Sequence, residues 1–370
     1  MIIHLRQTFL LIFILASHIL FAQENNAKYT YSSGAEIFKG FIIQHHDVIG
    51  DLIRGHPTGI SLKFNRHSYG NKAWEQRYGY PTFSSSLSYY DLKNDNVLGK
   101  IVALNIGLGF HLNDITSSKN DIQLYLGYGL AYFNNSYDPE TNNKNTVISS
   151  HLPWNVNLRL GYKRQITRRL NAGVTIHVSH FSNGSRTVPN YGLNIVSANL
   201  GASYMLQADK PSYQKDLKLV KSYNTKSYFN IDYRMGGTAR KPVGAGSSPY
   251  FAMSVFWNKR ISNKSIIDAG VEGFMNKGIE EEIKNNPTLI EGIPDYKAIG
   301  LMVGHELILE KLAFVTQVGV YVYKPFNPTE KIYAKIGLKY YITDHIFCSF
   351  ILKTHYGVAE VMEYGIGYRL

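Results

Sequence analysis

Long runs of alternating apolar and polar residues constrain the fold of this chain most strongly. The segment IVALNIGLGF, which begins at Ile101, alternates apolar side chains with asparagine and glycine. Such a period of two is typical of a β-strand that has two different faces. The same alternation recurs in IQLYLGYGLAY (122–132), WNVNLRLGYK (154–163) and KIYAKIGLKYY (331–341). The chain is therefore predicted to be an all-β protein.

The length of these segments favours a transmembrane barrel over a soluble sandwich. Strands of soluble sandwiches usually have about five or six residues, whereas alternating segments of about ten residues are typical of outer-membrane barrels. Such a sheet must close, because an open edge in lipid would leave backbone groups unpaired. The 28 tyrosines suit aromatic girdles at the membrane interfaces. Counting the segments predicts an antiparallel outer-membrane β-barrel of about sixteen strands.

The two ends of the sequence agree with export to the outer membrane. Residues 1–22 contain an apolar run closed by Ala22, which predicts a signal peptide that is cut after Ala22. The last residues, MEYGIGYRL, resemble the terminal strand by which outer-membrane barrels are recognised for insertion, so the insertion machinery is an expected partner. One face of that strand carries Met362, Tyr364, Ile366, Tyr368 and Leu370.

Charge and cysteine content limit the classes of site and partner. Cys348 is the only cysteine, so neither an internal disulfide nor a cysteine-based zinc site can form. The net charge of +12 suits anionic lipid or lipopolysaccharide phosphates, although a basic surface can also simply be solvated. Nucleic acid is not an expected partner of an exported chain.

One long polar segment raises the question of how many barrels there are. Short turns such as ITRR (166–169) and TDH (343–345) are expected on the periplasmic side, and long loops outside. Residues 207–226 break this pattern, because they form a long, lysine-rich connection on the periplasmic side. They could be an excursion within one barrel spanning residues 23–370, or a linker between barrels at 23–206 and 227–370. We expect one barrel, since the insertion-like final strand occurs once.

The strand NAGVTIHVSHFS ends with polar residues on its lipid-facing side. Val174, Ile176 and Val178 share one face with His180 and Ser182, and Asn194 has the same parity at the start of the next strand. Polar groups against acyl chains are costly without partners. They could lie in the headgroup layer, where no explanation is needed. Alternatively, Ser182 and His180 could form the nucleophile and base of a serine hydrolase whose substrate is a lipid.

The motifs HFSN and PNYG resemble the active-site hairpin of outer-membrane lipid A 3-O-deacylases, also called acyloxyacyl hydrolases. The match places the H-x-S-N motif on His180, Ser182 and Asn183, without any insertion before the turn. The turn motif P-N-x-G falls on Pro189, Asn190 and Gly192. The resemblance covers roughly residues 23–206 and is specific only at 180–194.

The resemblance implies a serine esterase that removes a 3-hydroxyacyl chain from lipid A of lipopolysaccharide, without metal or cofactor. Ser182 would attack the ester and His180 would move its proton. The third member of the triad would be Asn194, near the extracellular leaflet. Candidate substrate-binding groups in the loop are the Asn183 amide and the backbone N–H groups of Gly184 or Ser185 as oxyanion donors, and Arg186 for a lipid A phosphate.

Two departures and two alternatives stay open. The family has Glu at the position of Asn194, and a neutral amide orients the imidazole but does not offset its positive charge. About 160 residues also follow Leu206, beyond the usual small barrel. A non-catalytic pore or structural barrel would explain the polar inner faces equally well, and an outer-membrane phospholipase would differ only in the ester that it cleaves. The second H-x-S spacing, His177 and Ser179, faces the lumen and is expected to be structural.

Overall fold

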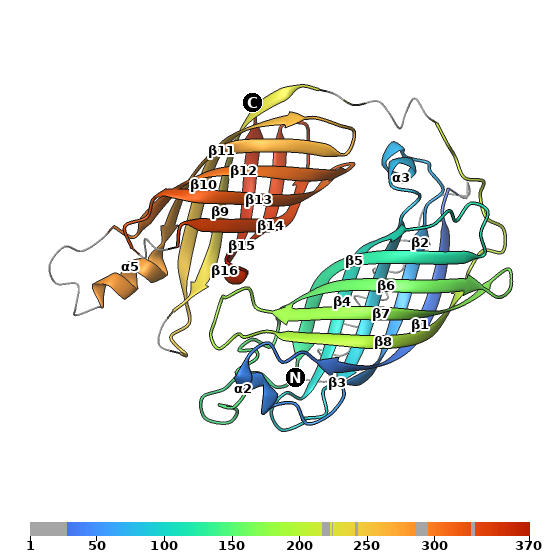
Figure 1. Ribbon diagram of the computed structural model, residues 1–370, viewed down its shortest axis with the longest axis horizontal. Coiled ribbons are helices and arrows are strands. Elements are labelled where there is room, and N and C mark those ends of the chain that lie inside the picture. Colours follow the sequence, from blue (N-terminus) through green and yellow to red (C-terminus); the bar gives the residue numbers. More distant parts are fainter. Residues whose placement is uncertain (1–27, 217–222, 224, 241–242, 286–294, 327–329) are drawn as a thin grey trace.

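The computed structural model describes residues 28–216, 223, 225–240, 243–285, 295–326 and 330–370. These residues contain sixteen antiparallel β-strands that close into two barrels of eight strands each (Figure 1). In each barrel every strand pairs with the next, and the last strand returns to the first. No helix among the described residues is long and apolar enough to cross a membrane.

Both barrels are simple meanders with short helices in their connections. The first consists of β1 (Thr30–Ile42), β2 (Thr58–His67), β3 (Thr82–Asp91), β4 (Lys100–His111), β5 (Asn120–Phe133), β6 (Trp154–Gln165), β7 (Leu170–Ser182) and β8 (Leu193–Met205). The second consists of β9 (Ser227–Ala239), β10 (Ser247–Arg260), β11 (Ser265–Asn276), β12 (Lys297–Leu309), β13 (Leu312–Tyr323), β14 (Ile332–Tyr341), β15 (Ile346–His355) and β16 (Val358–Arg369). The helices are α2 (Asp47–Gly50), α3 (Ala73–Arg77) and α5 (Lys277–Lys284).

The prediction of about sixteen strands is confirmed, but the expectation of a single barrel is wrong. Strand β8 pairs with β1 from Ser32–Met205 to Ile42–Ile195, so the first sheet is closed before the 207–226 connection begins. The final strand β16 pairs with β9 and therefore closes only the second barrel. The predicted signal peptide, residues 1–22, and residues 217–222 and 224 of the connection lie outside the described residues.

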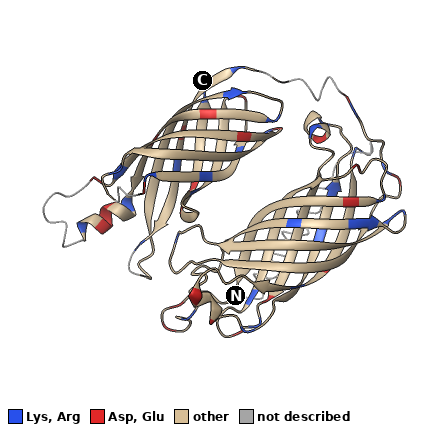
Figure 2. Cartoon of the chain, viewed as in Figure 1, with Lys and Arg blue, Asp and Glu red and all other residues tan. Residues whose placement is uncertain are grey.

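The alternation in the sequence separates the outer walls from the lumens, as predicted. Ile106 and Leu126 are 55% and 49% exposed on the outside, whereas Asn105, next to Ile106 on β4, is buried. The final strand likewise turns Tyr364 and Ile366 outward. Figure 2 shows acidic and basic residues at scattered positions along the strands of both barrels. Several of these charges, such as Arg159 and Glu272, are buried in the lumen, and the partly buried Glu36 and Lys63 form an ion pair.

The ends of each barrel differ, and we name them by their connections. The turn end carries the short turns 166–169 and 343–345, and the loop end carries the hairpin tips 183–192 and 356–357. At the loop end of the first barrel, a buried apolar cluster fills the lumen, and Phe181, Leu193 and Ile195 of β7 and β8 belong to it. The last inward side chains of these two strands are therefore packed in place.

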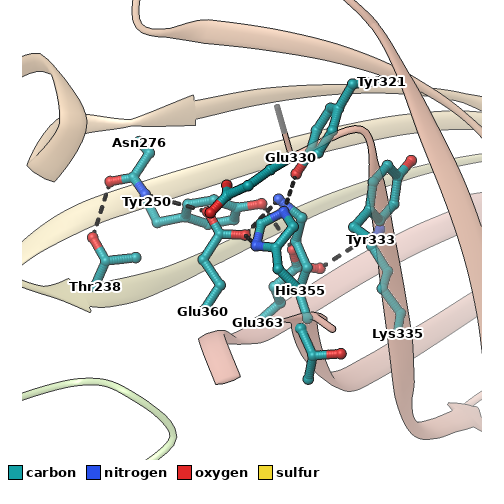
Figure 3. A network of polar contacts seen from close by, with 12 residues as sticks. Thr238, Tyr250, Asn276, Tyr321, Glu330, Tyr333, Lys335, His355, Glu360 and Glu363 are labelled. Carbon is teal, nitrogen blue, oxygen red and sulfur yellow. Dashed lines mark hydrogen bonds and ion pairs between the residues drawn. The ribbon is translucent and has the colours of Figure 1, made fainter. Parts of the chain in front are cut away.

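Charged and aromatic side chains fill the lumen of the second barrel. Arg234 forms ion pairs with Asp232, Glu272 and Glu363, and all four side chains are buried. Nearer the loop end, the Tyr250 hydroxyl donates to Glu363 at 3.0 Å, and Tyr321 bonds the His355 ring at 2.8 Å (Figure 3). Because each carboxylate of this network is paired with the Arg234 guanidinium, the network is tolerated in a closed lumen.

The two barrels contact each other at both ends. At the turn end, Lys72 beside α3 bonds Glu310 at 3.1 Å, and the Tyr78 hydroxyl donates to the Ile308 carbonyl at 2.8 Å. Burial raises the pKa of Tyr78 to about 12, so its hydroxyl stays a neutral donor. At the loop end, the Ala239 backbone N–H donates to the Ser185 carbonyl at 2.8 Å.

Candidate active site

The β7–β8 hairpin brings His180 and Asn194 together on the outer wall of the first barrel. The two residues are direct partners in the strand register. His180 Nδ1 lies 2.7 Å from Asn194 Oδ1, a hydrogen bond in which the ring N–H donates. Val174 and Ile176 on the same face of β7 are 53% and 59% exposed, which confirms the predicted outward parity. The arrangement orients the imidazole.

Ser182 ends β7 next to two hydrogen-bond donors. Its Oγ accepts from Asn190 Nδ2 at 3.0 Å and from the Gly184 backbone N–H at 3.2 Å. Among the described residues, no hydrogen bond joins Ser182 to His180. The two side chains nevertheless share the outward face, two residues apart on one strand. Ser182 Oγ can change its direction by rotation about χ1 between staggered rotamers.

The Asn183 side chain points away from Ser182 and holds the turn together. Its amide donates to Ser149 Oγ at 3.1 Å and to the Thr187 carbonyl at 2.9 Å, and its Oδ1 accepts from Arg186 N. Asn183 is 5% exposed. The structure thus brings Gly184 and Asn190 to Ser182, but not the Asn183 amide.

The remaining predicted loop residues set the shape of the hairpin tip. Pro189 precedes Asn190, whose Oδ1 accepts from the Asn183 backbone N–H at 3.1 Å. Gly192 has φ +78°, and a Cβ there would lie 3.2 Å from His180 Cε1, so only glycine leaves the imidazole its place. The Arg186 side chain is exposed and its backbone N–H is bound by Asn183.

His45 is a site residue that the sequence analysis missed. It follows β1, the strand that pairs with β8, and its Nδ1 lies 3.2 Å from Asn194 Nδ2. Its Nε2 lies 2.9 Å from the Tyr191 carbonyl. If Nε2 donates to that carbonyl, Nδ1 accepts from the Asn194 amide, which leaves Asn194 Oδ1 to accept from His180. Only closure of β8 onto β1 brings His45 here, so no local motif could reveal it.

The second H-x-S pair lies inside the barrel, as expected. His177 and Ser179 are each 1% exposed. Ser179 bonds His177 Nε2 at 2.9 Å and the Tyr90 hydroxyl at 3.0 Å, and His177 also bonds Asn157. These contacts make the pair part of the lumen packing. Within the described ranges, no cluster of three or more His, Cys, Asp or Glu side chains is arranged to hold a metal ion.

The geometry fits nucleophilic chemistry at the outer wall. With the Nδ1 proton donated to Asn194, His180 Nε2 is an acceptor that can take a proton from Ser182. The Gly184 N–H and the Asn190 amide both donate to Ser182 Oγ. From this position they can also stabilise a negative charge that develops on an atom beside Oγ. The site lies on the outward face of the barrel wall.

Comparisons with known proteins divide the chain in the same way as the two barrels. Residues 58–203 match the family model described as lipid A 3-O-deacylase (PagL), and residues 222–370 match the model described as acyloxyacyl hydrolase, C-terminal domain. No curated protein is matched by the sequence.

Solved structures similar to this chain include two barrels that align with about half of it. Neisserial surface protein A (NspA) is 13% identical, and the match covers 49% of this chain and 98% of the NspA chain, with a TM-score of 0.30. The outer membrane enzyme PagL is 15% identical, with coverages of 45% and 97% and a TM-score of 0.30. At these TM-scores the structural likeness carries no functional inference.

Proposed function

Since the chain belongs to the lipid A 3-O-deacylase (acyloxyacyl hydrolase) family, we propose that its β7–β8 hairpin is a serine esterase site that removes an ester-linked 3-hydroxyacyl chain from lipid A. The family places the chain in the outer membrane as a hydrolase that acts on lipid A. The observation that carries the finer proposal is the convergence of His180, Ser182 and Asn194 on the lipid-facing wall. The loop end then lies at the outer leaflet, where lipid A is found.

The reaction begins with proton transfer from Ser182 Oγ to His180 Nε2. As the proton leaves, Oγ bonds to the carbonyl carbon of the ester, and the carbonyl oxygen becomes an oxyanion. The C–O bond to the glucosamine then breaks, and His180 returns the proton to the leaving sugar hydroxyl. A water molecule repeats the sequence on the acyl-enzyme and releases the 3-hydroxy fatty acid with regeneration of Ser182.

The oxyanion donors in this proposal are the Gly184 N–H and the Asn190 amide. Both already donate to Ser182 Oγ, at 3.2 and 3.0 Å, so they lie beside the oxygen that attacks. The Asn183 amide, which the sequence suggested for this role, is occupied by Ser149 and Thr187. Asn183 instead orders the turn that carries the Gly184 donor.

Asn194 replaces the carboxylate of the family and takes its orienting role. Its Oδ1 accepts a hydrogen bond from the Nδ1–H of His180, which fixes the tautomer that catalysis needs. Its own amide donates to His45, and His45 is held by the Tyr191 carbonyl. The site therefore has an orienting amide in place of a charged acid.

The wall toward the turn end offers room for an acyl chain. An apolar hollow of about 660 Å³ is lined by outward residues that include Val174, Ile176, Ala198 and Leu200. Ile176 lies four residues from His180, which is about 13 Å at roughly 3.3 Å per residue. A chain lying in this hollow would present its ester at Ser182, with the sugar and phosphates toward Arg186.

A pore is less well supported by the packing of the lumens. An interior of eight strands is just wide enough for side chains to fill. The apolar cluster closes the loop end of the first barrel, and the Arg234 network occupies the second. Both observations favour a site on the wall over a channel through it.

The test uses the purified full-length protein with lipid A and with a phospholipid in matched micelles. We expect release of 3-hydroxy fatty acid from lipid A and none from the Ser182→Ala variant. Hydrolysis of the phospholipid alone would instead identify a phospholipase. Release by Ser182→Ala at the wild-type rate would place the chemistry elsewhere in the protein.

A further inference from the structure

We propose that the second barrel is a working part of the esterase site, because its outer wall holds the 183–187 turn so that the Gly184 N–H stays directed at Ser182. This inference rests on the proposed function of the β7–β8 hairpin. Met362 and Ala239 of the second barrel are then positioning residues, since they touch the turn and act on Ser182 through it. Phe350 packs on Trp154, the cross-strand partner of Ser182.

A cluster of four aromatic rings joins the two barrels beside the nucleophile. Trp154 and Tyr128 of the first barrel stack at 5.3 Å, and Phe350 of β15 packs edge-on against each of them at 5.2 Å. Tyr364 of β16 packs on Phe350, also at 5.2 Å. Trp154 is the cross-strand partner of Ser182 on β6. The contact between the barrels therefore begins one strand away from the nucleophile, and Figure 1 shows β16 beside the first barrel.

The turn itself contacts the second barrel through its backbone. The Ala239 N–H donates to the Ser185 carbonyl at 2.8 Å. A Cβ on Gly184 would lie 3.3 Å from Met362 Cβ, so the Gly184 backbone packs directly against that side chain. The second barrel thus touches the two residues that follow Asn183.

The backbone of this turn needs such support. Gly184 and Ser185 both have positive φ, at +67° and +62°. The left-handed region suits glycine but is unfavourable for a serine, which has a Cβ. A conformation of this kind persists when its surroundings hold it. Asn183 holds the turn from inside the first barrel, and Ala239 and Met362 hold it from the second.

The turn conformation sets the direction of the proposed oxyanion donor. If the contacts from the second barrel are removed, the Gly184 N–H is held less tightly toward Ser182. An oxyanion donor acts mainly in the transition state, so its misplacement lowers kcat and leaves KM nearly unchanged. Complete loss of one donor costs about a hundredfold to a thousandfold in kcat. We expect a loosened donor to cost about tenfold.

The experiment compares variants of the full-length protein in lipid A micelles. The double variant Phe350→Ala/Met362→Ala should lower kcat about tenfold with KM within about twofold. Labelling of Ser182 by a fluorophosphonate should slow by a similar factor, since the phosphonyl oxygen uses the same donors. Met362→Leu keeps the side-chain volume, so its kcat should stay close to that of the wild type, whereas the kcat of Met362→Ala should fall. The matched control is Met253→Ala, because Met253 is 51% exposed on β10 of the same barrel.

A second variant guards against simple misfolding of the aromatic cluster. Ala239→Pro lies at the end of β9 and removes the N–H that bonds Ser185, without opening a cavity. It should lower kcat several-fold in a barrel that stays heat-modifiable on gels. The inference is overturned if Phe350→Ala/Met362→Ala and Ala239→Pro both match Met253→Ala in kcat and in labelling rate. Activity that survives Ser182→Ala would instead overturn the proposed function.

Discussion

The β7–β8 and β15–β16 hairpins occupy the same place in their barrels but end differently. In the second barrel Tyr356 and Gly357, both with positive φ, make a tight two-residue turn. There the last residue of β15, His355, points inward to Tyr321 (Figure 3). In the first barrel, β7 continues its outward face to Ser182, and a ten-residue tip carries donors back to it. The two hairpins share one topology. Only the β7–β8 hairpin combines a long loop with polar residues at the end of its outward face, and the candidate site is there.

The largest expected effect separates these two hairpins. Ser182→Ala and His180→Ala should each lower deacylation by at least about a thousandfold, and the double variant should be barely worse, since catalytic partners act as a unit. His355→Ala in the second barrel should leave the rate within about twofold. Initial rates of fatty-acid release from lipid A measure all four variants. Losses that multiply in the double variant would mean that Ser182 and His180 do not share a step.

The lumens of the barrels differ as clearly as their hairpins, and this predicts the next largest effect. Arg234 offsets three buried carboxylates, whereas Arg159 in the first barrel donates to the neutral Ser86 hydroxyl and lies over Tyr125. Arg234→Met should destabilise the second barrel by about 3–5 kcal/mol, because the three carboxylates lose the guanidinium that they share. Arg159→Met should cost less. Heat-modifiability on gels gives the midpoint temperature of unfolding for each variant. Equal shifts of this midpoint for Arg234→Met and Arg159→Met would contradict the difference between the lumens.

Variants of Asn194 test how the β7–β8 hairpin works with an amide at the position where the family has a carboxylate. Asn194→Ala should lower turnover by about tenfold to a thousandfold, the range expected for one positioned group in acid–base chemistry. Asn194→Glu should retain or raise activity, because a carboxylate also stabilises the charged imidazole. The measurement is turnover on purified lipid A. An Asn194→Ala enzyme as fast as the wild type would show that another group orients His180.

The smallest expected effect concerns His45, which forms a hydrogen bond with Asn194 and is expected to act on His180 mainly through it. Its hydrogen bond to the Asn194 amide is a single neutral contact, worth about 1 kcal/mol, or roughly fivefold. His45→Ala should therefore lower turnover about fivefold in the wild type and have almost no effect in the Asn194→Ala background. An equal loss in both backgrounds would mean that His45 does not act through Asn194.

Much of the architecture follows from local pattern, because strand faces are set by parity. The outward placement of His180, Ser182 and Asn194 and the inward placement of His177 and Ser179 could be predicted from the sequence. The closure of two barrels could not, since strand pairing such as that of β8 with β1 is non-local. The closure of β8 onto β1 brings His45 to Asn194, and the contact between the barrels brings Met362 to Gly184. The direction of the Asn183 and Asn190 amides depends on turn geometry, which residue spacing alone does not fix.

The most direct test of the central claim is the mass of lipid A in the membrane where the protein acts. Lipid A is extracted from cells that lack the gene, carry the wild type or carry Ser182→Ala, and is compared by mass spectrometry. We predict that the wild type removes the mass of one 3-hydroxyacyl chain and that Ser182→Ala matches the cells without the gene. Identical lipid A in all three, with the wild-type barrel folded in the outer membrane, would contradict the account.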